Sequence, residues 1–329
     1  MLKFFVSGIK IIISVIMAFT SIFGIFTGDR QGKITRAESG CEASFAVISD
    51  THLKNNPFRQ GILELGLKDM ERAKDKLDAV VFNGDITENS YEQMWGCFAR
   101  AMSKYDVAKD TIMVIGNHDT RNHGDITGVT EIFARYNKIV SNRDIDKVYY
   151  STKIGKYTAI ILGSEGDNTD AYVSDEQIEW FRGEMAKASE TGLPVFIFFH
   201  QSINGTHGLP YKWELDENDR PDRGGIGAAS DTILGIIKQY KNVFYISGHI
   251  HEGFSVNAEK NGFTSVEKYD GYTLINVPCY MYPDFIRKGV ISNGTGYVFE
   301  MYNDKVLIRA RNFITGTWCT KYDVTVDIT

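Results

Sequence analysis

The chain has few prolines and no excess of basic residues, and both scarcities limit what it can be. Six prolines in 329 residues, of which 43% are apolar, are not the composition of a disordered chain and leave enough apolar side chains for a sizeable core. We therefore expect one large domain. A strong grip on nucleic-acid backbones needs a basic face, and the formal net charge here is −6. Strong nucleic-acid binding is not expected.

Cysteine is scarce as well. The four cysteines, Cys41, Cys97, Cys279 and Cys319, do not have the spacing of a zinc motif. Four cysteines permit three disulfide connectivities, and free buried thiols are an equal alternative. The sequence therefore predicts no particular disulfide bond.

Acidic residues are absent before Asp29, and this absence sets the N-terminal segment apart. Lys3 and Lys10 precede an apolar run over residues 11–26. A basic start followed by a short apolar run predicts that residues 1–28 are a signal peptide, and a membrane anchor that stays uncleaved, with membrane contact through residues 4–26, is the alternative. In either case we expect the folded part to be exported, and either secreted or anchored at the outer face of the cell membrane.

The rest of the chain divides into a short polar segment and a long folded part. Residues 29–43 are polar and aperiodic, which predicts a tether. The domain is expected over residues 44–329. Within it, residues 204–227 combine turn formers, aromatics and charges without a sustained period and predict a long loop. Loops of this length in compact domains tend to be functional.

Short apolar runs rich in Val, Ile and Phe alternate with longer amphipathic stretches along the domain. The runs predict strands over residues 45–49, 79–82, 111–115, 157–162, 195–199 and 243–247. The amphipathic stretches predict helices over residues 61–77, 91–105, 175–189 and 230–240. After Gly253 the sequence predicts only strands, over residues 272–277, 296–301, 305–311 and 322–327. We therefore expect an α/β layered sandwich that ends in antiparallel strands.

Polar residues that can bind metal follow directly after five of these predicted strands. The chain reads AVISDTH, VVFNGD, MVIGNHD, FIFFH and FYISGHIH at these places. Because α/β sheets bind ligands at the carboxyl ends of their strands, several such ends can converge on one point. The candidate ligands are Asp50, His52, Asp85, Asn117, His200, His249 and His251.

Histidine is scarce too, and its placement is informative. Five of the seven histidines in the chain follow these strands. Packing gives no reason for this concentration, whereas converging imidazoles and carboxylates suit a metal site. A capped turn or a hydrogen-bonded His is the alternative for any one block taken alone. Gly84, Gly116 and Gly248 precede candidate ligands, where a tight backbone turn is needed.

Taken together and in order, the blocks resemble the calcineurin-like metallophosphoesterase superfamily. They are Asp50-x-His52, Gly84-Asp85, Gly116-Asn117-His118-Asp119, His200 and Gly248-His249-x-His251. The motifs cover residues 45–251, and the strand-rich tail to about residue 326 matches by general pattern only. The resemblance implies a central β-sandwich flanked by helices, with a binuclear metal centre.

Carried over position by position, the resemblance implies a ligand set for each of two metal ions. The ligands of the first would be Asp50, His52 and His251. The ligands of the second would be Asn117, His200 and His249. Asp85 would bridge both ions. The set offers oxygen and imidazole nitrogen but no thiolate, which suits Mn, Fe or Zn and disfavours a structural zinc site.

The resemblance also implies hydrolysis without a protein nucleophile. Two cations roughly 3.5–4 Å apart clamp a phosphate and lower the pKa of a bound water, so that hydroxide attacks phosphorus near neutral pH. The sequence contains neither a GxSxG elbow nor a P-loop. His118 would donate a proton or hydrogen bond to the ester oxygens, and Asp119 would orient His118.

The sequence thus predicts an exported phosphoesterase that acts on a small phosphomonoester or phosphodiester. A phosphodiesterase for cyclic nucleotides or lipid head groups is an alternative that the same motifs support. A metal-stabilised binding module without catalytic activity is an alternative of another class. Modules of that kind usually lack the His of the GNH block or some ligands, and here none is missing.

Overall fold

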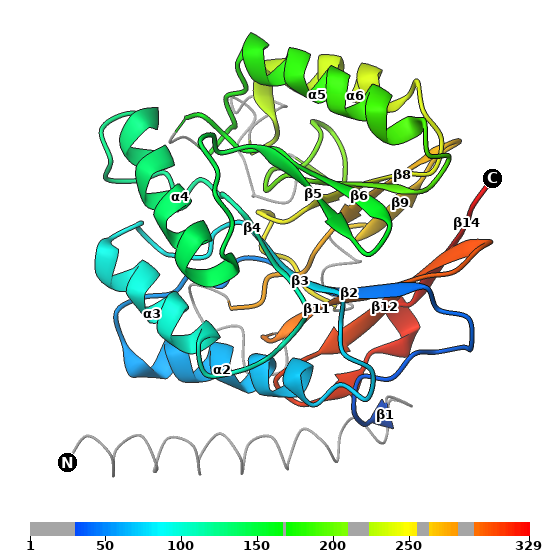
Figure 1. The fold of residues 1–329 in the computed structure, drawn as a ribbon, viewed down its shortest axis with the longest axis horizontal. Helices are drawn as coiled ribbons and strands as arrows, with labels where there is room; N and C mark the ends of the chain where they lie inside the picture. Colours follow the sequence, from blue (N-terminus) through cyan, green and yellow to red (C-terminus); the bar gives the residue numbers. More distant parts are fainter. Residues whose placement is uncertain (1–29, 167–168, 210–223, 255–262, 282–292) are drawn as a thin grey trace.

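Two mixed β-sheets packed face to face form the centre of the computed structural model, which describes residues 30–166, 169–209, 224–254, 263–281 and 293–329 (Figure 1). The first sheet contains, in spatial order, β1 (Arg30–Gln31), β13 (Thr317–Trp318), β12 (Lys305–Asn312), β11 (Thr295–Met301), β2 (Ala43–Ile48), β3 (Ala79–Asn83) and β4 (Thr111–Val114), with β14 (Val324–Asp327) paired to β12. The second contains β5 (Tyr150–Ile154), β6 (Tyr157–Ile161), β7 (Val195–Phe198), β8 (Val243–Ser247), β10 (Tyr272–Asn276) and β9 (Val266–Lys268).

Parallel pairing runs through the middle of each sheet. In the first, β2 pairs with β3 and β3 with β4, all parallel. In the second, β6, β7, β8 and β10 are parallel neighbours. Parallel strands end at a common edge, so the residues that follow them are brought to the same side of each sheet.

Helices cover the two sheets from outside, which gives four layers (Figure 1). The helices α2 (Pro57–Glu71), α3 (Glu92–Met102) and α4 (Ile126–Ser141) lie along the first sheet. The helices α5 (Asp175–Ser189) and α6 (Ser230–Ile237) lie along the second. Together with the antiparallel strands β11, β12 and β14 near the C-terminus, this arrangement confirms the predicted α/β layered sandwich.

Side-chain alternation along the buried strands assigns residues to the two cores. In β7, Phe196 and Phe198 belong to the core between the sheets, whereas Val195 and Ile197 belong to the core under α5 and α6. Between the sheets, the ring of Phe45 stacks on Phe299 with centroids 4.7 Å apart and meets Phe196 edge-on at 5.1 Å. This aromatic cluster joins the two sheets beneath the strand ends.

The helices begin at their N-capping residues rather than at the first residue of the apolar pattern in the sequence. α2 begins at Pro57, where Asn56 accepts a hydrogen bond from the Arg59 backbone N–H, so it starts before the predicted residue 61 and ends at Glu71. α4 and β5 were not predicted. α4 is capped by Asp125, and its buried residues recur at helical spacing.

The segment predicted as a polar tether is held against the domain where the structure describes it. β1 pairs antiparallel with β13, Ile34 is buried, and the carbonyl of Gly32 accepts a hydrogen bond from Arg311. Backbone hydrogen bonds and the buried side chains of Ile34, Cys41 and Ala43 therefore fix a segment whose composition suggested a free chain. The predicted signal or anchor over residues 1–28 and residues 210–223 of the predicted loop lie outside the described residues.

The four cysteines are free thiols. No helix among the described residues is long and apolar enough to cross a bilayer.

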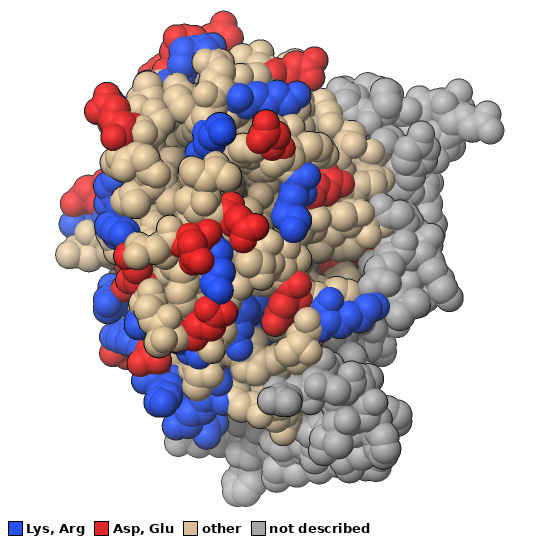
Figure 2. All heavy atoms as spheres, turned by 90° about the vertical axis from the view of Figure 1, so that its right-hand side faces the viewer, with Lys and Arg blue, Asp and Glu red and all other residues tan. Residues whose placement is uncertain are grey.

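On the face shown in Figure 2, lysine and arginine side chains are intermixed with aspartate and glutamate side chains rather than gathered into one basic surface over the described part of the chain.

Truncation of Phe45 should test how far the sheet-to-sheet core holds the fold together. Phe45 is fully buried, so Phe45→Ala should lower the free energy of unfolding by about 3–5 kcal/mol. Urea denaturation followed by circular dichroism measures the change. Tyr172→Ala, at a side chain that is 60% exposed, serves as the control and should change stability by no more than about 0.5 kcal/mol. Equal effects of the two variants would contradict this account.

Candidate metal centre

The candidate ligands follow the carboxyl ends of five parallel strands, three from the first sheet and two from the second. Asp50 and His52 follow β2, Asp85 follows β3, and Asn117 follows β4. In the second sheet, His200 follows β7, and His249 and His251 follow β8. Backbone hydrogen bonds join the loops, from Asp50 N to Gly84 O at 3.1 Å and from Gly248 N to His200 O at 2.8 Å.

Five of these seven residues have left-handed backbone conformations. Their φ angles are 58° at Asp50, 42° at His52, 49° at Asp85, 71° at His249 and 56° at His251. A non-glycine residue in this region costs about 1–3 kcal/mol and persists only where its surroundings fix it. The concentration of such residues at one place indicates that the turns are shaped for the side chains they present.

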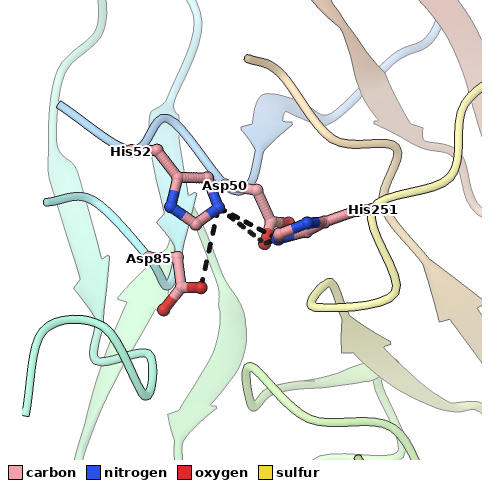
Figure 3. Close-up of side chains that lie close together, drawn as sticks. All are labelled: Asp50, His52, Asp85 and His251. Atoms are coloured by element: carbon pink, nitrogen blue, oxygen red, sulfur yellow. Dashed lines mark hydrogen bonds and ion pairs between the residues drawn. The ribbon is translucent and has the colours of Figure 1, made fainter. Parts of the chain in front are cut away.

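The donor atoms form two groups that share the carboxylate of Asp85. In the first, His52 Nε2 lies 2.9 Å from His251 Nε2, and Asp50 Oδ1 lies 3.2 Å from His251 Nε2. Asp85 Oδ2 lies 3.8 Å from His52 Nε2. Figure 3 shows these four side chains turned toward one another from the loops after β2, β3 and β8.

The second group contains Asp85, His200 and His249, whose donor atoms lie within 4.8 Å of one another. His200 Nε2 is 3.2 Å from Asp85 Oδ2. Asn117, the remaining candidate of this group, is buried with its Oδ1 atom outside any hydrogen bond. The structure thus gathers six of the seven predicted side chains around the Asp85 carboxylate, with Asn117 buried in the loop after β4.

Unsatisfied buried atoms show that this donor set fits cations. Asp50 Oδ1, Asp85 Oδ2, Asn117 Oδ1 and His200 Nε2 are buried and make no hydrogen bond of normal geometry. Burying such groups without a partner is costly, so their convergence points to a bound species that they coordinate. Carboxylate oxygen, amide oxygen and imidazole nitrogen are ligands of divalent transition metals.

The opposite atoms of the same side chains are held by the protein. His200 Nδ1 lies 2.8 Å from Asn83 O, Asp85 Oδ1 accepts from His118 N at 2.8 Å, and Asp50 Oδ2 accepts from His249 N at 3.2 Å. Such outer contacts fix the orientation of metal ligands. The inward-facing atoms of these three side chains are therefore pre-positioned.

Comparison of the sequence with family models also indicates a metal-dependent phosphoesterase. The model of the calcineurin-like phosphoesterase family matches residues 43–253, which is the stretch that carries all seven candidate ligands and His118. The chain belongs to this family of metal-dependent hydrolases. Members of the family typically use two metal ions, which agrees with the two groups around Asp85.

Individual relatives agree with the family in name and in fold. A probable glycerophosphodiester phosphodiesterase from Arcobacter nitrofigilis is 22% identical over 219 residues, which covers 62% of this chain and 70% of the relative. Among solved structures, a dimetal phosphatase from Danio rerio superposes with a TM-score of 0.59 at 14% identity, covering 88% of this chain and 100% of that one. A purple acid phosphatase from yellow lupin (Lupinus luteus) gives a TM-score of 0.57 at 12% identity, covering 87% of this chain and 53% of that one. The two structures show that the phosphoesterase fold is shared.

The electrostatics of this phosphoesterase centre favour cations. Burial by itself would raise the pKa of Asp85, but His200, His118 and His52 outweigh burial and hold that pKa well below its ordinary value. Burial would lower the pKa of His200, yet Asp85 and Asp50 raise it to about 9. For His249, burial and the neighbouring His200 lower the pKa to about 3. The Asp85 carboxylate is therefore ionised and attracts positive charge.

His118, the residue expected to act on the ester oxygens, stands beside the ligands. Its Nε2 atom lies 3.9 Å from Asp85 Oδ2, and its side chain is 15% exposed. Its Nδ1 atom lies 2.8 Å from both Glu88 O and Arg121 Nη1. A carbonyl only accepts and a guanidinium only donates, so Nδ1 hydrogen bonds to one or the other according to its tautomer.

Asp119 has a different place from the one expected. Its carboxylate accepts hydrogen bonds from the backbone N–H groups of Ile86, Thr87 and Gly116 and from the hydroxyl of Thr87, at 2.7–3.1 Å. The ring of His118 is not among these donors. Burial, and next the charge of Asp85, raise the pKa of Asp119 to about 7. Asp119 joins the loop after β3 to the loop after β4, because backbone N–H groups of both loops donate to its carboxylate.

Two residues beside the centre were not singled out from the sequence. Glu88 lies in the same loop as Asp85, and its Oε2 atom is 3.3 Å from His52 Nδ1. Arg121 follows the GNHD block and contacts His118. A charged residue close in sequence to a ligand is a weak signal, since only the folded loops reveal which way it faces.

The glycines before the ligands serve mainly to leave space. Gly84 has a φ of +88°, as a tight turn requires. At Gly116, a Cβ atom would lie 2.2 Å from both the backbone nitrogen and Oδ1 of Asp85. At Gly248 it would lie 2.0 Å from Ser49 Oγ and 2.9 Å from Asp50 Oδ2. A tight turn was expected at all three glycines, but only Gly84 has a positive φ. Gly116 and Gly248 are needed because a Cβ atom would collide with neighbouring groups.

Gly116→Ala should displace Asp85 and weaken metal binding. Disturbed outer contacts typically reduce metal affinity by about 10- to 100-fold, and we expect a loss in this range. Competition with a chromophoric chelator for Mn²⁺ measures it. Gly61→Ala is the matched control, because a Cβ at Gly61 in α2 meets nothing within 4 Å. Metal affinity like that of the unmodified protein in Gly116→Ala would show that Asp85 does not need this space.

Proposed function

We propose that this phosphoesterase hydrolyses small phosphodiesters at the centre around Asp85. The observation that supports the reaction class is the convergence of buried, unsatisfied oxygen and nitrogen atoms on one carboxylate shared by two ligand groups. The relative named for glycerophosphodiesters supports a diester as the substrate. The acidic net charge of −6 supports a small substrate over a nucleic-acid strand.

The chemistry would divide between the ions and His118. Two divalent ions, when bound, would supply a nucleophilic water near neutral pH and neutralise the phosphate charge. One ion would be held by Asp50, His52 and His251. The other would be held by Asn117, His200 and His249, and Asp85 would contact both ions. The Nε2 atom of His118 would donate a proton or hydrogen bond to an ester oxygen when Nδ1 accepts from Arg121, or when the ring is protonated and Nδ1 donates to Glu88 O. Mn, Fe or Zn all suit this donor set.

Catalysis is supported over a purely binding role. Both groups of donor atoms share Asp85, and His118 stands beside them with a side chain that is 15% exposed. A protein that used metal only for stability would have no need of an accessible imidazole next to the shared carboxylate.

An ester panel tests the choice between diester and monoester. With Mn²⁺ added, the purified full chain should show a higher kcat/KM toward bis(p-nitrophenyl) phosphate than toward p-nitrophenyl phosphate. Within the panel, a glycerophosphodiester should be hydrolysed faster than a 3′,5′-cyclic nucleotide. A preference for the monoester would reject the proposed substrate class and keep the site, whereas a fully metallated protein inert toward every ester would reject the enzyme.

His118→Ala should separate chemistry from metal binding. Removing the imidazole should lower kcat by about 10²- to 10⁴-fold, since this is the usual contribution of a general acid. Metal content should stay at that of the unmodified protein, because His118 belongs to neither proposed ligand group. Steady-state kinetics and metal analysis on the same preparation measure both quantities. Unchanged turnover would remove His118 from the mechanism.

We also propose that residues 1–28 direct export, with the enzyme secreted or anchored at the outer face of the cell membrane. The apolar run after Lys10 and the lack of acidic residues before Asp29 support this location. N-terminal sequencing of protein recovered from separate cell fractions tests it. An intact N-terminus on protein confined to the cytosol would contradict the proposal.

A further inference from the structure

Glu88 turns its carboxylate toward a metal ligand rather than toward solvent. Its Oε2 atom lies 3.3 Å from His52 Nδ1, and both atoms are buried and make no hydrogen bond of normal geometry. The side chain of His52 is fully buried, and that of Glu88 is 16% exposed. The other oxygen, Oε1, faces Lys54 at 3.7 Å.

The two nitrogens of His52 face different surroundings. Nε2 lies among Asp50, Asp85 and His251, so it must carry a lone pair if it is to bind a metal ion. The proton of the neutral ring then belongs on Nδ1, which faces Glu88. A carboxylate at this position favours that tautomer and fixes the plane of the ring. It also makes Nε2 more basic and therefore a stronger metal ligand.

The backbone holds Glu88 in place without help from its side chain. Glu88 N donates to Leu53 O at 3.0 Å, and Leu53 N donates to Ile86 O at 2.9 Å. A β-bridge joins Leu53 to Thr87. The carbonyl of Glu88, which contacts His118 Nδ1, is part of this backbone. Substitution of the side chain should therefore leave the loop and the His118 contact intact.

We propose that Glu88 is a positioning residue that keeps His52 in the Nδ1–H tautomer with Nε2 directed at the first metal position. This inference rests on the metal centre of the proposed function, but not on the identity of the substrate. A purely structural ion pair between Glu88 and Lys54 is the competing explanation, and Lys54→Met tests it directly.

The tautomer is measured on the metal-free protein. Long-range ¹H–¹⁵N NMR spectra, with the His52 signals assigned through His52→Gln, should show a protonated Nδ1 and an unprotonated Nε2 in the neutral ring. Glu88→Ala should shift His52 toward the other tautomer or a mixture, whereas Lys54→Met should leave it unchanged. An Nδ1–H signature that survives Glu88→Ala would overturn the proposal.

Metal affinity gives a second readout that needs no substrate. In chelator competition with Mn²⁺, Glu88→Ala should weaken one of the two sites by about 10- to 100-fold and leave the other unchanged. Glu88→Gln, which keeps the shape and an acceptor oxygen, should fall between Glu88→Ala and the unmodified protein, and it keeps the test valid if Glu88→Ala folds poorly. An equal loss in Lys54→Met, or no loss in either Glu88 variant, would overturn the proposal. Inactivity toward diesters would bear on the proposed function alone.

Discussion

Loops from both sheets place metal-binding side chains around one buried carboxylate, that of Asp85, and the geometry of the centre depends on it. Asp85 follows β3 of the first sheet, and its Oδ2 atom lies 3.2 Å from His200, which follows β7 of the second sheet. Burying this oxygen without a hydrogen bond is costly, and so is burying the atoms of Asp50, Asn117 and His200 beside it. Bound cations would offset that cost, so the packing of the two sheets favours a metal site at this place.

Strained turns are the consequence of bringing so many donors to one point. A ligand that follows a buried strand must turn its side chain across the sheet edge within one or two residues. Left-handed φ angles at Asp50, His52, Asp85, His249 and His251 achieve that turn. Such conformations persist only where the surroundings fix them, and here the parallel strands and the Phe45 cluster beneath them supply the rigid support. Stability of the core and geometry of the site are therefore linked.

Three carboxylates from two adjoining loops differ in role because they differ in partners. Asp85 leaves one oxygen open toward the ligands. Asp119 is equally buried, but both of its oxygens accept hydrogen bonds from the backbone or Thr87, so it braces the loops. Glu88 is partly exposed and faces His52. Burial and hydrogen-bond partners, more than residue type, decide which carboxylate is left to bind a cation.

The sequence by itself determined the layered α/β architecture and the chemical type of the site. Apolar runs are local features, and strands β2, β3, β4, β7 and β8 end within one residue of their predicted ends. The ligands were visible because each follows such a run. Helix α4 was not predicted because Thr127, Gly128 and Val129 have low helix propensity. The N-cap residue Asp125 was a sequence signal that could have indicated it. Only the tertiary structure decided that Asp119 faces backbone amides, that Glu88 faces His52 and that Gly116 must leave room for Asp85. These facts depend on how loops distant along the chain face one another, and no local pattern of residues encodes that.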